Sequence, residues 1–108
     1  MKIPESVRIA GVDYAVIDNV PGLNDGTHML MGQIDYLDCE IRIADRTSSV
    51  QMKGITLWHE ILHGIHANSG MELENEEAVI EMFARGIYQV LQDNGRRLFD
   101  IVSDPDAP

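Results

Sequence analysis

The segment His59-Glu60-Ile61-Leu62-His63 places two histidines four positions apart inside a stretch that predicts one helix. Residues with this spacing lie one above the other on the same face of an α-helix. Two imidazoles so placed can bind one zinc ion, and the glutamate between them can reach a water molecule beside the ion as a general base. The chain is therefore expected to fold so that this helix lines a cleft.

The composition predicts one small domain in the cytoplasm. The chain has 108 residues, of which 44% are hydrophobic, so its core is small and a bound metal would help to stabilise it. Residues 1–95 are expected to form this domain and residues 96–108 a partly disordered tail. No apolar run approaches the roughly 20 residues needed to cross a membrane. The N-terminus lacks a signal-peptide stretch, and Cys39, the single cysteine, forms no internal disulfide.

The charge of the chain argues against one class of partner. Eighteen acidic residues outnumber eight basic ones, which gives a formal net charge of −10. Binding to the phosphates of nucleic acid requires clustered lysine and arginine. We therefore expect no nucleic-acid partner, no membrane partner, and a protein partner that is basic or neutral rather than acidic.

The first 47 residues predict a small twisted sheet of three or four strands. The segments on either side of Gly11 are rich in β-branched residues, as in the two strands of a hairpin. The segment around residues 39–44 alternates apolar and charged side chains, as in a half-buried strand, and its edge is expected to hold an extended peptide. The predicted strands cover residues 7–17, 29–36 and 39–43, and a loop rich in Pro, Gly and Asn covers residues 18–28.

The first predicted helix begins at Ser48, which has capping-box spacing with Gln51, and runs to about Asn68, with Gly70 as its terminator. On a helical wheel the three histidines lie together beside a broad apolar face. The histidines are His59, His63 and His66, and the apolar face comprises Ile55, Leu57, Trp58, Ile61, Leu62 and Ile65.

The second predicted helix begins at Asn75, a favourable N-cap residue, and ends near Asn94, with Gly95 following it. The fold class is therefore α+β, with the sheet packed on the histidine-bearing helix and on a second helix that carries glutamates. The buried stripe of the second helix is predicted to comprise Val79, Ile80, Phe83, Ala84, Ile87, Val90 and Leu91.

A third metal ligand is expected from the start of the second helix. Catalytic zinc generally has three protein ligands and a fourth position open to water. A turn at Gly70 would bring the acidic start of the second helix back toward the histidines. The helical wheel places Glu76 nearer the centre of the apolar stripe and Glu77 at its edge, beside Glu81, so either Glu76 or Glu77 can face the histidines. His66 lies one turn past His63 and is a more distant alternative, so a role beside the ligands or at the surface is favoured for it over ligation.

The segment Asn75-Glu76-Glu77-Ala78 and the acid at Glu81 resemble the glutamate motif of thermolysin-like gluzincins. In that family the glutamate before alanine is the third zinc ligand, and an acid four residues later hydrogen-bonds a ligand histidine. The resemblance implies the first role for Glu77 and the second for Glu81. The chain departs from the motif by the extra Glu76 and by a glutamate, rather than an aspartate, at position 81.

The whole chain, over roughly residues 5 to 95, also resembles small phage-borne and bacterial proteins that carry the same histidine motif. The shared features are an N-terminal hairpin, Thr56-Leu57 before the motif, and a helix like that of residues 86–94. The group is similar to minimal zincins and is related in plan to metallopeptidases that cleave phage repressors. The resemblance implies a phage or prophage origin and location in the host cytoplasm.

Residues and resemblance together lead us to expect a zinc-dependent metallopeptidase with one zinc per chain. His59, His63 and Glu77 would hold the metal, and Glu60 would act as general base. The substrate would be a peptide or protein, and a further protein could be needed to activate the enzyme. The alternative is a zinc-stabilised binding or regulatory protein without hydrolysis, because no residue is clearly placed to stabilise an oxyanion. Tyr36 and Tyr88 are the candidates for that role, and no feature assigns an oligomeric state.

Overall fold

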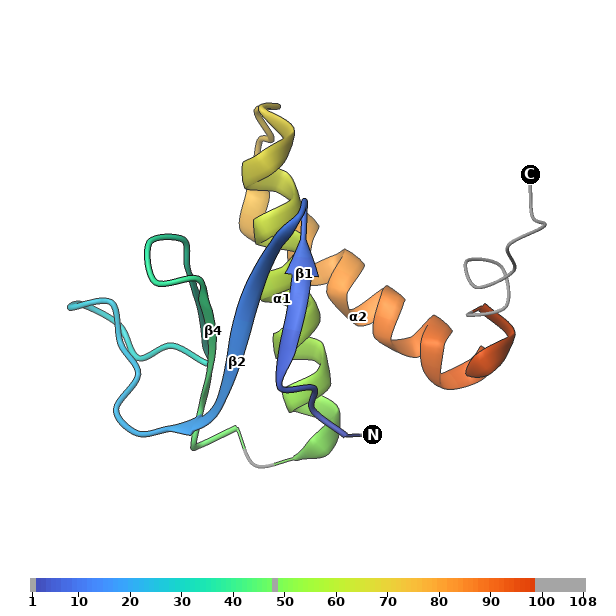
Figure 1. The fold of residues 1–108 in the computed structure, drawn as a ribbon, viewed down its shortest axis with the longest axis horizontal. Coiled ribbons are helices and arrows are strands. Elements are labelled where there is room, and N and C mark those ends of the chain that lie inside the picture. The colour runs from blue at the N-terminus through green and yellow to red at the C-terminus, as the bar shows by residue number, and fades with distance from the viewer. Residues whose placement is uncertain (1, 48, 99–108) are drawn as a thin grey trace.

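The structure, a computed structural model, describes residues 2–47 and 49–98 and has an α+β fold (Figure 1). A mixed sheet of four strands precedes two helices, which agrees with the expected fold class. The elements in chain order are β1 (Ser6–Ile9), β2 (Val12–Val20), β3 (Gly32–Asp35), β4 (Glu40–Ala44), α1 (Val50–Ser69) and α2 (Glu76–Asn94).

The sheet has the strand order β1-β2-β4-β3. β1 and β2 form the expected antiparallel hairpin through Ala10 and Gly11, which both have positive φ angles. β2 then pairs in parallel with β4, and β4 pairs in the antiparallel sense with β3. β2 extends to Val20 across an irregularity after Ile17, so the loop predicted from residue 18 begins later than expected. Similarly, only Gly32–Asp35 of the predicted strand 29–36 is paired as a strand.

The expectation that residues 39–44 offer a free edge was wrong. β4 lies inside the sheet, between β2 and β3, so its backbone groups are already paired on both sides. The edges of the sheet formed by the described residues are β1 and β3. The strand whose free edge lies beside α1 and can pair with an extended peptide is therefore β3.

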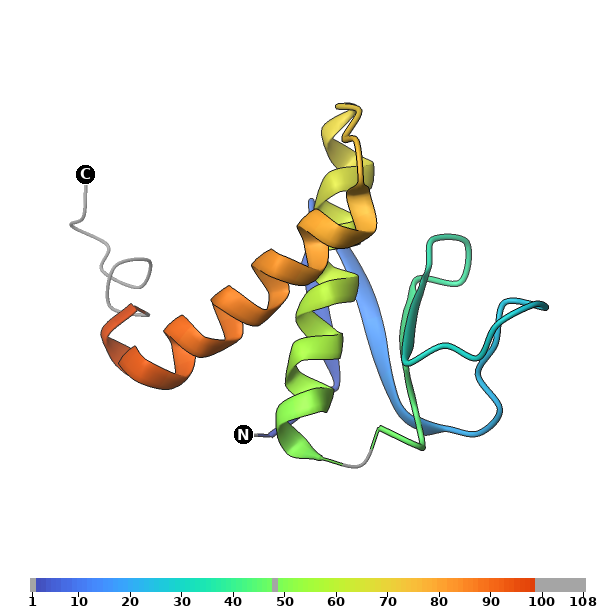
Figure 2. The ribbon, with the colours of Figure 1, turned by 180° about the vertical axis from the view of Figure 1, so that it is seen from behind.

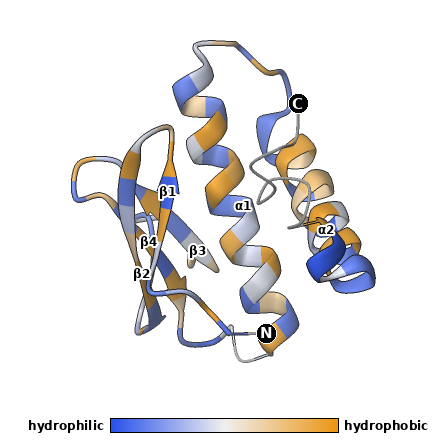
Figure 3. Ribbon diagram, turned by 45° about the vertical axis from the view of Figure 1, so that its right-hand side comes forward, coloured by the Kyte–Doolittle hydropathy of each residue, from blue (hydrophilic) through white to orange (hydrophobic). Residues whose placement is uncertain are grey.

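α1 lies between the sheet and α2 (Figure 3). Its Leu57 packs into a core on the sheet side, and its Ile55 packs against α2 on the other side. Ile65, expected on the apolar face, is half exposed. The residues buried with Leu57 are Ile9, Tyr14, Ile41 and Ile43.

The helix ends are set by short-range capping. The Ser49 hydroxyl accepts a hydrogen bond from the Met52 amide at 3.0 Å, so Ser49 is the N-cap of α1. The capping box predicted at Ser48 falls on a residue outside the described ones. Gly70 ends α1 in the left-handed conformation, as expected. Asn75 precedes α2 in the same conformation, but its side chain makes no capping hydrogen bond, contrary to expectation.

α2 packs on α1 and on no other element of the described residues. The two axes diverge from the connecting turn, so the C-terminal half of α2 stands away from the rest of the molecule (Figures 1 and 2). The buried face is rotated from the predicted stripe: Tyr88 is buried with Ile80 and Ala84, whereas Phe83 and Val90 are about half exposed. Beyond Gly95, residues 96–98 form a helical turn, and the rest of the predicted tail lies outside the described residues.

Neither helix of the described residues is long and apolar enough to cross a membrane.

Candidate metal centre

The two histidines of the motif meet as the helical spacing predicts. His59 and His63 project from successive turns of α1, and their Nε2 atoms lie 3.1 Å apart. The ring centroids are 4.8 Å apart and the ring planes are tilted by 57°. Both rings are largely covered, with 17% and 14% of their side-chain surface exposed.

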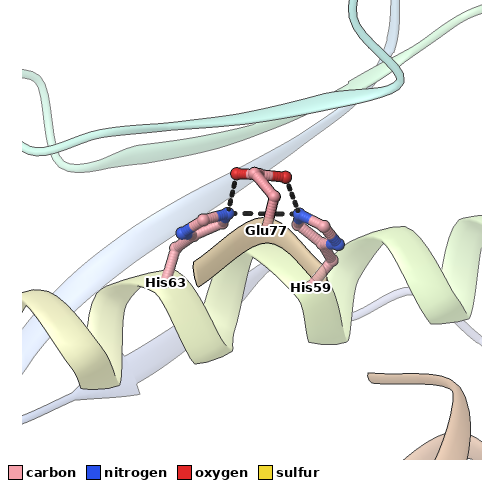
Figure 4. Close-up of side chains that lie close together, drawn as sticks. All are labelled: His59, His63 and Glu77. Atoms are coloured by element: carbon pink, nitrogen blue, oxygen red, sulfur yellow. Dashed lines mark hydrogen bonds and ion pairs between the residues drawn. The ribbon is translucent and has the colours of Figure 1, made fainter. Parts of the chain in front are cut away.

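Glu77 joins the two histidines from α2 (Figure 4). One carboxylate oxygen lies 3.1 Å from His59 Nε2 and the other lies 2.7 Å from His63 Nε2. Gly70 ends α1 in the left-handed conformation, and residues 71–75 return the chain so that α2 begins beside the histidines. Two nitrogens and a carboxylate therefore converge on one point, and their ligand atoms all lie within 4.8 Å of one another.

The outward nitrogens of both histidines also contact carboxylates. His59 Nδ1 lies 3.2 Å from Glu81, and His63 Nδ1 lies 2.6 Å from Glu76. A carboxylate beside Nδ1 favours the tautomer that carries its proton there, which leaves the Nε2 lone pair pointing inward. Glu76 thus faces the outer side of His63, while Glu77 faces the inner side of both rings.

Three acceptor atoms with inward lone pairs repel one another unless a positive charge lies between them. A tetrahedral zinc site with bonds of about 2.0–2.1 Å has ligand atoms about 3.3 Å apart. The separations of 2.7 to 3.1 Å between the Nε2 atoms of His59 and His63 and the Glu77 oxygens are close to that spacing. The donor set and its spacing fit a small divalent cation.

Glu60 is buried beside this cluster, with only 7% of the residue exposed. Burial raises the pKa of its carboxyl group, because the charged form loses hydration. The neighbouring His59 and His63 and the Ile34 amide oppose this rise, and Glu77 adds to it.

The close approach of β3 encloses Glu60, and it depends on Gly32. A Cβ atom at Gly32 would lie 2.5 Å from Thr56 Cγ2 and 3.2 Å from a Glu60 carboxylate oxygen. This role of Gly32 was not predicted from the sequence. The available signal was a glycine inside a predicted strand, which often marks a close backbone approach.

A cleft of about 680 Å³ contains the whole cluster. α1 and the start of α2 form one side, and β3 and the loop before it form the other. Acidic side chains in its wall are Asp25, Glu60, Glu76, Glu77 and Glu81, and no lysine or arginine of the described residues lines it. The apolar part of the wall comprises Met29, Leu30, Met31, Ile34, Met52 and Ile55.

Of the two tyrosines considered, only Tyr36 lines the cleft. Its hydroxyl donates a hydrogen bond of 3.2 Å to the backbone carbonyl of His63, and 48% of the residue is exposed. Partial burial and the nearby acidic groups raise the pKa of this phenol. Tyr88 is buried between α1 and α2, outside the cleft.

No family model matches the chain, and neither a curated protein nor a solved structure matches it.

Proposed function

We propose that the protein is a zinc-dependent metallopeptidase. The observation that carries this proposal is the convergence of His59 Nε2, His63 Nε2 and the Glu77 carboxylate in a cleft that also contains the buried Glu60. Two histidines and one glutamate are a ligand set of catalytic zinc sites, in which a fourth position is left to water.

Zinc bound by such a set acts as a Lewis acid, which makes water more acidic and polarises a peptide carbonyl. The chain supplies the base. Glu60 lies one residue after the first ligand, and its carboxylate lies on the β3 side of α1, near Gly32. We propose that a Glu60 carboxylate oxygen accepts a proton from the attacking water and returns it to the nitrogen of the leaving amine. The raised pKa of Glu60 suits both halves of that transfer.

The edge of β3 supports an extended peptide as the substrate. β3 lines the cleft and is the edge strand on that side of the sheet. A peptide that pairs with such an edge is held by main-chain hydrogen bonds, with alternate side chains pointing into the cleft. This replaces the predicted pairing along residues 39–44, which the interior position of β4 prevents.

One observation favours the non-catalytic alternative. Within residues 2–47 and 49–98, α2 packs on α1 alone, so a metal shared between His59, His63 and Glu77 would hold the two helices together. Such a metal could serve folding without hydrolysis. The intact and buried Glu60 distinguishes the two proposals, since a purely structural site has no use for a base there.

The test compares the wild type with Glu60→Gln, His63→Ala and the control Glu74→Gln, which changes an exposed carboxylate of the turn outside the cleft. Zinc content is measured after purification without chelator, and hydrolysis is followed with a peptide library. We expect about one zinc per chain in the wild type and in both Gln variants, and loss of zinc in His63→Ala. Cleavage should disappear in Glu60→Gln and persist in Glu74→Gln.

We expect slow and selective cleavage, because a single small domain offers few contacts with which to stabilise a transition state. A protein that binds zinc firmly and cleaves nothing would support the binding or regulatory alternative. A protein that neither contains zinc nor gains thermal stability on its addition would refute the proposal.

A further inference from the structure

We propose that His66 and Glu76 form an arm that positions the metal ligand His63 from outside. The inference rests on the proposed zinc site and does not depend on hydrolysis. From the sequence alone, Glu76 was expected as an alternative ligand, and His66 as an exposed residue or one beside the ligands rather than as a ligand itself. In the structure they lie behind His63, on the side of the ring opposite to Glu77.

The arm is continuous from one histidine to the next. One oxygen of Glu76 lies 2.6 Å from His63 Nδ1, and the other lies 3.0 Å from His66 Nδ1. A carboxylate with a histidine nitrogen close to each of its two oxygens is restricted in position and orientation. It therefore fixes the ring plane and tautomer of His63, which determines where Nε2 points.

The ring of His66 has one polar contact among the described residues, the one with Glu76. His66 Nε2 is buried and has no hydrogen-bond partner among the described residues. Leaving a buried nitrogen unpaired costs free energy. The ring nevertheless lies with Nδ1 toward Glu76, so the contact with Glu76 is the polar interaction that fixes the orientation of His66.

A second arm supports the other histidine and serves as an internal comparison. Glu81 contacts His59 Nδ1 at 3.2 Å and Arg85 at 3.4 Å. Arg85 is 53% exposed at its side chain, whereas that of His66 is 21% exposed. Contacts of exposed charged groups are screened by water and contribute little. The His66–Glu76 arm should therefore contribute more to the geometry of the site than the outer part of the Glu81 arm.

The experiment measures zinc affinity by competition with a chromophoric chelator, with thermal unfolding of each metal-free variant as a check of folding. His66→Leu keeps the bulk of the ring but removes the donor, and we expect it to weaken zinc binding about tenfold. His66→Asn places an amide N–H near the position of Nδ1 and should restore most of the affinity. Arg85→Gln, the matched change in the exposed arm, should alter affinity by no more than about twofold.

Coupling between the two residues is the decisive result. If His66 acts through Glu76, His66→Leu should have no effect on zinc affinity in a Glu76→Ala background. Equal loss of affinity in both backgrounds, or no loss in the wild-type background, would overturn the proposal even if His63→Ala abolishes binding. Absence of zinc binding in the wild type would overturn both this inference and the proposed function.

Discussion

Gly32 is the point at which β3 passes closest to α1, and adding one methyl group there tests how the cleft is built. In Gly32→Ala the new Cβ would lie 2.5 Å from Thr56 Cγ2, about 1 Å or more inside ordinary van der Waals contact. Thr56 is 6% exposed and is β-branched, so its side chain cannot turn away easily. β3 must therefore shift away from α1.

Overpacking of this kind costs about 1–3 kcal/mol. The lower entropy of alanine in the unfolded chain offsets about 0.4–1 kcal/mol of that cost. These ranges leave a net loss of about 0–2.6 kcal/mol in the free energy of unfolding. We expect a value near the middle, about 1–2 kcal/mol, or roughly 4–16 °C in Tm for a domain of this size. Urea denaturation of the metal-free protein measures the loss.

The double variant Gly32→Ala/Thr56→Ser identifies the cause of that loss. Serine keeps the hydroxyl and lacks Cγ2, so the double variant should be more stable than Thr56→Ser and Gly32→Ala would predict by simple addition. Cleavage should also fall in Gly32→Ala, because the new Cβ would lie 3.2 Å from the Glu60 carboxylate. A Gly32→Ala variant as stable as the wild type would show that β3 does not approach α1 this closely.

Two further predictions concern the acidic side chains of the cleft. Burial raises the pKa of Glu60 in the folded state, so the stabilising contribution of its protonated carboxyl is fully present below the unfolded pKa of 4.5 and is lost as pH rises through the folded pKa. Metal-free Glu60→Gln should therefore be more stable than the wild type at pH 7, and the difference should shrink below about pH 4.5. An unchanged difference across this range in urea titrations would contradict the assignment. Glu77→Ala should nearly abolish zinc binding, whereas Glu81→Ala should weaken it about 10–100-fold, as for a group that orients a ligand. The opposite ranking in zinc titrations would transfer the ligand role to Glu81.

The parts of the site that could be predicted from the sequence are those set by local geometry. The spacing of His59 and His63 guarantees their meeting once the segment is helical. The turn at Gly70 returns the chain because a left-handed glycine ends α1. The position of Glu77 opposite the histidines followed from a motif resemblance, since the helical wheel alone mildly favoured Glu76.

The parts that could not be predicted depend on pairing between distant segments. The interior position of β4 arises from its parallel pairing with β2, about 25 residues earlier, and nothing in residues 39–44 specifies that neighbour. The face of α2 was misjudged for a related reason. A wheel that counts apolar residues assumes broad burial. In the described part of the chain α2 packs on one element only, so a narrow strip through Ala84 and Tyr88 is buried and Phe83 is left half exposed. Ser48 and Ser49 have the same capping chemistry, so the sequence could not choose between them.

The attachment of α2 through one face has a consequence for how a metal would enter and leave. His59 and His63 are on a helix that packs into the sheet core, whereas Glu77 is on a helix that, as far as the structure describes the chain, packs only on α1. Local opening of α2 therefore requires less free energy than opening of the sheet. Such an opening removes Glu77 and leaves the two histidines in place, so the rate of metal exchange should follow the packing of Ala84 and Tyr88 against α1. The lifetime of the bound metal would then be set by a helix contact remote from the ligands.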